Sequence, residues 1–186
     1  MNVTTRKAAA VGAAPLLAAA WFAAFNLRTG FIGVGPLIPS ITADLSLTST
    51  AASTLVAIPT LMMGLVSMGG GALADRMGAA RTIALGLLLV AVGGGLRAAS
   101  HSLTPLVLWT ILFGIGIGIA QPALPRLTRG LFPRRLGIAT GIYASGLVSG
   151  SILAGSLTIP IETRFAPGAG WRGPLIFWSI VAAVAL

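Results

Sequence analysis

One arginine stands inside a long uncharged stretch and is the residue best suited to bind a solute. Arg28 is the only charged residue in the run 11–39. In a membrane helix such a charge costs about 2.5–3.5 kcal/mol, so it should face a cavity or a partner. The three acids, Asp44, Asp75 and Glu162, lie near the ends of apolar runs and are poorly placed to neutralise it. We therefore expect Arg28 to bind an anionic group; outward extension of its side chain and helix packing are the alternatives.

Four further side chains are candidates for the same site. Trp21 and Phe25 precede Arg28 by seven and three residues, so on a helix they share its face and can form an apolar wall. Gln121 and Tyr143 are polar groups in other apolar runs, where they can reach a central cavity. Each of these side chains can equally serve packing between helices, and both readings stay open at this stage.

A second group of charges falls between two apolar runs. The segment 71–81 reads GALADRMGAAR and contains Gly71, Asp75, Arg76, Gly78 and Arg81. Asp75 can interact with basic side chains and helix N-termini, and Gly78 permits a tight turn. The two arginines can pair or extend along the apolar surface toward water. We expect a charged loop here, with a purely structural turn as the alternative.

The composition nearly excludes a soluble protein. The 186 residues are 56% hydrophobic and 8% charged, whereas soluble domains carry roughly a quarter charged residues. The net charge of +9 predicts no nucleic-acid partner, because the basic residues punctuate apolar runs instead of gathering on one face. Cysteine is absent, which excludes disulfides and thiolate chemistry. No metal-ligand cluster, nucleophile–base pair or phosphate loop is found, so we expect neither a cofactor nor an enzyme.

Apolar runs between the charges predict an all-α integral membrane protein. A span takes about 20 apolar residues, so the length holds roughly six spans. We place them at 11–39, 50–73, 82–96, 105–125, 136–159 and 174–186.

Alternating the sides of the membrane puts the N-terminus and the basic loops 75–81 and 126–135 together, on the side that should be cytoplasmic. Arg97, which ends the third span on the other side, is expected to extend outward to the interface.

The sixth run is too short to span. Its roughly 13 residues cover about 20 Å of a hydrocarbon core about 30 Å thick. We expect a truncated sixth helix and a natural product that continues beyond Leu186.

Spans one and four share the patterns PLIPSIT (36–42) and PALPRLT (122–128), which favour an inverted repeat of three plus three helices. In span five, small residues spaced by four form two lines that favour close helix packing; the first is Gly146, Gly150 and Ala154, and the second is Gly137, Gly141, Ser145 and Ser149.

The segment 71–81 resembles the signature G-x-x-x-D-R-x-G-x-x-R of the major facilitator superfamily, although Ala79 and Ala80 replace the usual extra basic residues. Asn26-Leu-Arg28, the Pro36–Pro39 exit, Phe132-Pro133 and Trp171-Arg172 further resemble the cyanate and 2-nitroimidazole (CynX/NimT) transporter branch. The resemblance covers essentially the whole chain. It implies the first six-helix half of a transporter, in which Gly71, Asp75, Arg76, Gly78 and Arg81 form part of a cytoplasmic gate.

The resemblance also implies a substrate class and a membrane. The branch suggests a small anion or polar heteroaromatic solute, moved by alternating access in the cell (inner) membrane. The superfamily's span-four arginine is replaced by Thr110, which argues against the usual route of proton coupling. The other half is expected in the same natural chain or by dimerisation. The alternative is a non-transporting six-helix membrane module that self-associates or binds a partner subunit.

Overall fold

The computed structural model describes the backbone of residues 3–165 and 167–186, and the side chains from residue 14 onward apart from residue 166. Arg6 and Lys7, part of the expected cytoplasmic charge, lie outside the described side chains. Every regular element in the described residues is a helix, so the predicted all-α membrane fold class is confirmed. The helices are α1 (Val3–Ile32), α2 (Val34–Asp44), α3 (Ser49–Met77), α4 (Ala79–Ala98), α5 (Leu103–Ala120), α6 (Ala123–Leu131), α7 (Leu136–Pro160), the π-helix η1 (Ile161–Phe165) and α8 (Arg172–Val184).

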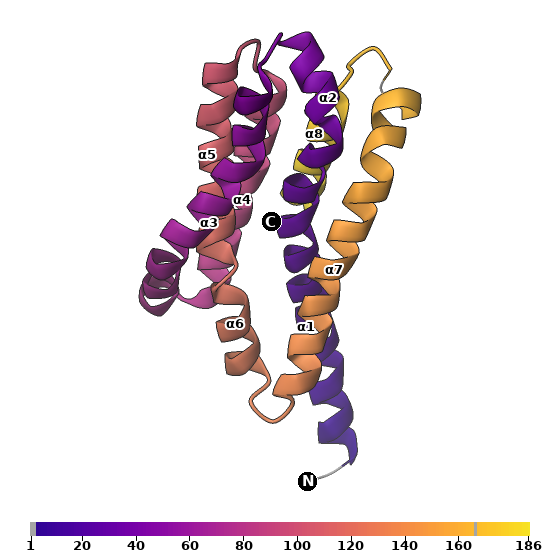
Figure 1. The fold of residues 1–186 in the computed structure, drawn as a ribbon. Coiled ribbons are helices and arrows are strands. Elements are labelled where there is room, and N and C mark those ends of the chain that lie inside the picture. Colours follow the sequence, from indigo (N-terminus) through magenta and orange to yellow (C-terminus); the bar gives the residue numbers. More distant parts are fainter. Residues whose placement is uncertain (1–2, 166) are drawn as a thin grey trace.

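Five helical segments are long and apolar enough to cross a membrane, counting only the described residues. They run along the long axis of the bundle (Figure 1) and comprise Ala14–Asp44, Ser49–Met77, Ala79–Ala98, Leu103–Leu131 and Leu136–Phe165, with Arg172–Val184 as a shorter apolar helix. The molecule is therefore a multi-pass membrane protein. Most of these helices begin before or end after the ranges expected from hydropathy, because they continue through the polar residues at their ends.

Two of the segments are broken. The helix of the first is interrupted at Gly33, between α1 and α2, and that of the fourth at Gln121 and Pro122, between α5 and α6. Proline has no N–H to donate, so Pro36 leaves the carbonyl of Ile32 without its usual helical partner. The matching patterns 36–42 and 122–128 both fall where the second helix of a broken pair begins. The paired prolines therefore mark equivalent breaks.

Glycines bring the helices into close contact. Any Cβ at Gly146 or Gly150 of α7 would collide with the backbone carbonyls of Trp21 and Phe25 on α1. The second line of small residues in α7 is different, since a Cβ at Gly137 or Gly141 meets nothing within 4 Å. Close approaches of the same kind join α5 to α3 and α4, at Gly70, Gly86, Gly93, Gly114, Gly116 and Gly118. Packing thus accounts for one of the two small-residue lines.

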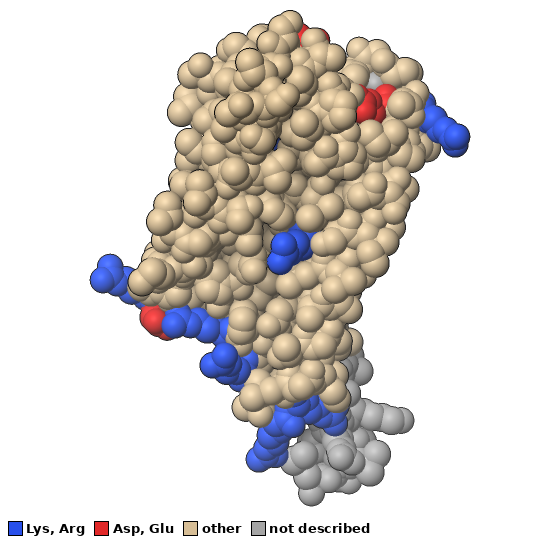
Figure 2. All heavy atoms as spheres, viewed as in Figure 1, with Lys and Arg blue, Asp and Glu red and all other residues tan. Residues whose placement is uncertain are grey.

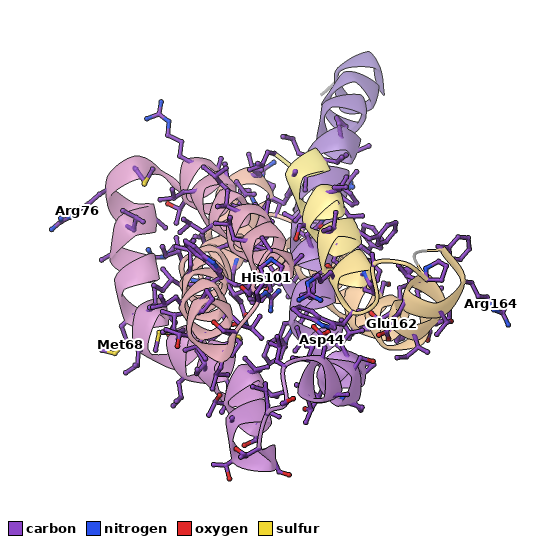
Figure 3. The ribbon with its side chains drawn as sticks, turned by 90° about the horizontal axis from the view of Figure 1, so that it is seen from above. Asp44, Met68, Arg76, His101, Glu162 and Arg164 are labelled. Atoms are coloured by element: carbon purple, nitrogen blue, oxygen red, sulfur yellow. The ribbon has the colours of Figure 1, made fainter. Side chains whose placement is uncertain are left out.

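Charge is concentrated at the two ends of the bundle. Figure 2 shows basic groups gathered at the lower end of the viewed face, where the α3–α4 and α6–α7 connections lie in Figure 1. One further basic group stands alone at mid-height of that face, surrounded by uncharged surface. Looking down from the opposite end, Figure 3 shows Asp44 and His101 near the centre, with Glu162 to one side. The two ends therefore differ in charge as expected from the spacing of basic residues in the sequence.

Candidate functional site

The 71–81 segment forms an ion pair with a residue outside the motif. Asp75 Oδ1 at the end of α3 lies 2.8 Å from Arg126 Nη1 of α6. The same Arg126 nitrogen donates to the carbonyl oxygen of Gly71, so one side chain holds two turns of α3. Pairing with Arg126 was not predicted. Its signal was present, because alternating the sides of the membrane places the loops containing Asp75 and Arg126 at one end. We call Asp75, Arg126 and Gly71 the inner latch, after the side of the membrane expected from the sequence.

The predicted charged loop is reduced to one residue. Gly78 has φ of +89°, a value that suits glycine, and it both ends α3 and precedes α4. Arg76 and Arg81 are exposed, and Arg76 points away from the bundle in Figure 3. Within the described part of the chain neither forms an ion pair with Asp75. The helices thus bring Asp75 toward α6, while its two neighbouring arginines face outward.

A cavity of about 520 Å³ lies between α3, α7 and the α5–α6 break. Its polar lining comes from Thr60 and Ser67 of α3, Gln121 at the break and Tyr143 of α7. The remaining lining is apolar or glycine and proline, with no charged side chain among the described residues. Gln121 and Tyr143 are far apart in sequence, so the fold brings two of the predicted site residues onto one cavity.

The inner latch lies directly beyond one end of this cavity. Pro125 lines the cavity and Arg126 follows it in the chain; Ser67 lines the cavity and Gly71 lies one turn further along α3. The cavity also shares Thr60 with a groove of about 750 Å³ between α2 and α3. One end of the cavity therefore lies next to an ion pair, and Thr60, which lines the cavity, also lines the groove.

The three predicted residues of α1 lie elsewhere. Trp21 and Phe25 stack with ring centres 5.4 Å apart, and they pack against α7 and α8. Trp21 Nε1 also donates to Ser145 Oγ of α7 at 3.1 Å. Arg28 is half-buried, and within the described residues no hydrogen bond or ion pair holds its side chain. Among the predicted residues, Gln121 and Tyr143 line the cavity, whereas Arg28, Trp21 and Phe25 are not among its lining residues.

A polar cluster at the other end of the bundle was not predicted. Asp44 Oδ2 accepts hydrogen bonds from Trp171 Nε1 at 3.0 Å and Arg172 Nη1 at 2.9 Å. Arg172 Nη2 donates to the carbonyl oxygen of Ser100 at 3.1 Å. The cluster joins the end of α2 to α8 and to the residues after α4. We call it the outer cluster; the Trp171-Arg172 pair was its sequence signal.

The expectation for Arg97 is wrong. Its side chain does not extend to the interface but is 2% exposed, inside the bundle. Nη2 donates to the carbonyl oxygen of Gly30 at 3.3 Å, and the guanidinium lies 3.9 Å from the ring centre of Phe113. Gly94 explains the difference, because its lack of a side chain leaves room for α8 beside α4 and so closes the bundle over Arg97.

Taken together, these features define a polytopic helical membrane protein with a cavity between its helices and an ion pair beyond one end of that cavity. The chain belongs to the Major Facilitator Superfamily, whose sequence pattern matches residues 20–186.

Individual relatives agree with this family. The chain is 33% identical to the transporter YycB of Bacillus subtilis over 165 residues, which cover 89% of this chain and 40% of the relative. It is 29% identical to the cyanate transport protein CynX of Escherichia coli over 161 residues, or 87% of this chain and 41% of the relative. It is also 29% identical to the 2-nitroimidazole transporter of E. coli over 173 residues, or 92% and 42%. The chain thus spans about two-fifths of the length of these relatives.

Proposed function

We propose that this chain forms one half of a secondary transporter that moves a small polar solute across the cell membrane by alternating access, with its N-terminus cytoplasmic. The observation that carries the proposal is the position of the inner latch just beyond a cavity between membrane-crossing helices. Alternating access requires a central site that is closed on one side at a time. An ion pair beyond one end of the cavity, with a groove that shares Thr60 with it, is an arrangement that suits such a mechanism.

The solute proposed here is a small anion or a polar heteroaromatic molecule. A cavity of about 520 Å³ is within the range of small-ligand sites, roughly 300–1,000 Å³. Gln121 can donate and accept hydrogen bonds, and the Tyr143 hydroxyl can do both. The apolar remainder suits a flat ring. Two relatives are named for cyanate and 2-nitroimidazole, and these two compounds are the natural first solutes to test.

Arg28 has a separate part in this proposal. It lies half-buried among buried neighbours on α1, so it is the side chain of that turn directed out of the bundle. With no acidic partner among the described residues, its charge would be satisfied by a solute anion that lies between the two halves. Trp21 and Phe25 would support Arg28 by fixing α1 against α7. Their contribution to solute binding would then be indirect, in place of the apolar wall expected from the sequence.

The facing half is proposed to come from the same natural chain, with a dimer of halves as the other possibility. Large apolar side chains point away from the bundle on α3, where Leu61, Leu65 and Met68 are 59%, 69% and 86% exposed. Figure 3 shows Met68 at the outer edge of the view. Such a surface suits lipid or another helical half. A shared interface would place the α3 side of the cavity near the centre of the complete molecule.

The test is uptake of labelled cyanate and 2-nitroimidazole into liposomes containing the purified natural gene product. Time-dependent uptake above that of empty liposomes is expected, at a lower rate in Asp75→Asn. A folded protein that neither binds nor transports either compound would overturn the solute assignment. If the protein neither binds nor transports any of a broad panel of small solutes, and forms a stable complex with another membrane protein, the non-transporting module is favoured.

A further inference from the structure

Arg97 carries a buried charge that the proposed transport site does not use. Two of its nitrogens, Nε and Nη1, are buried without a hydrogen-bond partner in the described structure. The whole chain has three acids; Asp44 and Asp75 pair with Arg172 and Arg126. An ion buried without a counter-charge is expensive, so an apolar side chain would serve packing better. A role beyond packing is therefore needed to explain an arginine here.

Direct binding of a solute does not explain it. The space beside Arg97 is about 10 Å³, enclosed by α1, α4, α5 and α8, which is about the size needed for one water molecule. The groups that favour the positive charge are fixed parts of the protein. They are the carbonyl oxygen of Gly30, the face of Phe113 and the carboxyl end of α4.

The contact with Gly30 falls at the break of the first membrane segment. Gly30 lies three residues before Gly33, where α1 gives way to α2. Its position is tight, because a Cβ would lie 2.9 Å from the Phe113 ring and 3.6 Å from Arg97 Nη2. Arg97 therefore reaches from α4 to the last turn of α1 and holds it next to the break.

The Cα of Gly30 and the side chain of Arg28 lie on nearly opposite faces of α1. Two residues correspond to about 200° around a helix, so holding Gly30 against α4 turns Arg28 away from it. The burial pattern agrees: Leu27, Thr29 and Gly30 are buried, and Arg28 is half-buried. From this geometry we propose that Arg97 is a positioning residue, which fixes the rotation of α1 beside this break and so keeps Arg28 directed out of the helical bundle. The value of that position for transport rests on the proposed role of Arg28.

The first experiment measures the position of residue 28 without transport. The 186 residues contain no cysteine, so Arg28→Cys introduces one thiol into this half, with any cysteine elsewhere in the natural product replaced by serine. The probe is the rate of reaction with a small, negatively charged methanethiosulfonate. Adding Arg97→Met should slow the reaction about tenfold. Loss of one charged hydrogen bond allows a shift of this size between the conformation in which residue 28 is directed out of the bundle and those in which it is not. Arg97→Lys, which keeps a charged donor, should restore part of the rate.

Arg164→Met in the same background is the matched control, because Arg164 is an exposed arginine of η1 and points away from the bundle (Figure 3). An unchanged reaction rate in a folded Arg97→Met protein overturns the proposal. If that variant does not fold, Gly30→Ala takes its place, since the new methyl group must displace the Phe113 ring, against which the Arg97 guanidinium lies. An unchanged rate there overturns the proposal equally.

The second experiment separates this inference from the proposed function. With Arg28 intact, Arg97→Met should raise KM for uptake of cyanate or 2-nitroimidazole and leave kcat within about threefold, because positioning acts on binding. A slowed thiol reaction with unchanged KM keeps Arg97 as the residue that positions α1 and removes Arg28 from the solute site. Unchanged values in both experiments remove Arg97 from any positioning role.

Discussion

Arg126 of α6 lies 2.8 Å from Asp75 of α3 and also donates to the carbonyl oxygen of Gly71. The pair joins the two halves of the expected inverted repeat, one helix from each. Both side chains are well exposed, at 40% for Arg126 and 67% for Asp75. An exposed pair contributes at most about 1 kcal/mol to folding stability, so its value lies in which helices it holds together.

Asp75→Asn should therefore impair cycling with little loss of stability or solute affinity. A change of about 1 kcal/mol between two conformations alters their ratio roughly fivefold, which is enough to slow a cycle that must visit both. Transport rate, binding and thermal unfolding are measured on the same preparation. The charge exchange Asp75→Arg with Arg126→Asp should recover part of the rate. An unchanged uptake rate at equal protein level removes Asp75 from the gate.

Tyr143→Phe and Gln121→Leu should weaken solute binding by removing hydrogen-bonding groups from the cavity. Each loss should raise Kd about threefold to tenfold, the effect of one or two ordinary hydrogen bonds. Ser156→Ala is the control, since Ser156 is on the same helix as Tyr143 and, among the described residues, its hydroxyl donates only to the carbonyl of Ile152 in its own helix. Calorimetric titration with the transported solute measures Kd. Equal affinity in all three variants places the site outside this cavity.

Arg28→Ala should abolish binding of an anionic solute. Arg28→Lys keeps the charge but loses the planar pair of donors, so it should retain weak binding if charge dominates and little if two-point geometry dominates. Thermal stabilisation by small anions, nitroheteroaromatics and neutral or cationic compounds reports binding, with Arg164→Ala as the control. Wild-type affinity in Arg28→Ala removes Arg28 from the site, and a preference for cations contradicts the proposed solute class.

Gly150→Ala should destabilise the bundle by about 1–3 kcal/mol, because the new methyl group collides with the Phe25 carbonyl and forces α1 from α7. Gly155→Ala on the same helix meets open space and should change stability by less than about 0.5 kcal/mol. Chemical unfolding of both variants in the same detergent makes the comparison. Equal stability of the two variants would mean that α1 and α7 are not in close contact at this position.

Asp44→Asn should loosen the outer cluster, because Asp44 Oδ2 is the common acceptor of Trp171 and Arg172. The cluster links α2 to α8, so thiol reagents should reach a cysteine placed at Thr42, in the α2–α3 groove, at a different rate. Glu162→Gln is the control: this acid is on η1 and forms no ion pair in the described part of the chain. Identical rates in Asp44→Asn and wild type would show that the cluster does not control α2.

Composition and the spacing of charges were sufficient to predict the fold class. An apolar chain with few charges must satisfy its backbone hydrogen bonds internally in lipid, and helices do so within each segment. The motif at 71–81, which indicated the family, could also be read locally. It needs a glycine at Gly78 because the chain turns there between two helices. The matching proline patterns 36–42 and 122–128 were also visible in the sequence as a sign of an inverted repeat, but that each follows a break in its membrane segment came from the structure.

The tertiary structure decided which residues meet. Asp75 pairs with Arg126, 51 positions away, instead of with the neighbouring arginines, and only the packing of α6 beside α3 brings the two together. Gln121 and Tyr143 reach one cavity for the same reason. Arg97 is the clearest case: hydropathy put it at a helix end facing water, whereas glycine-mediated approach of α8 enclosed it against Gly30 and Phe113. Periodicity along one helix describes that helix's own faces, but the neighbour that covers each face depends on how closely the other helices can approach.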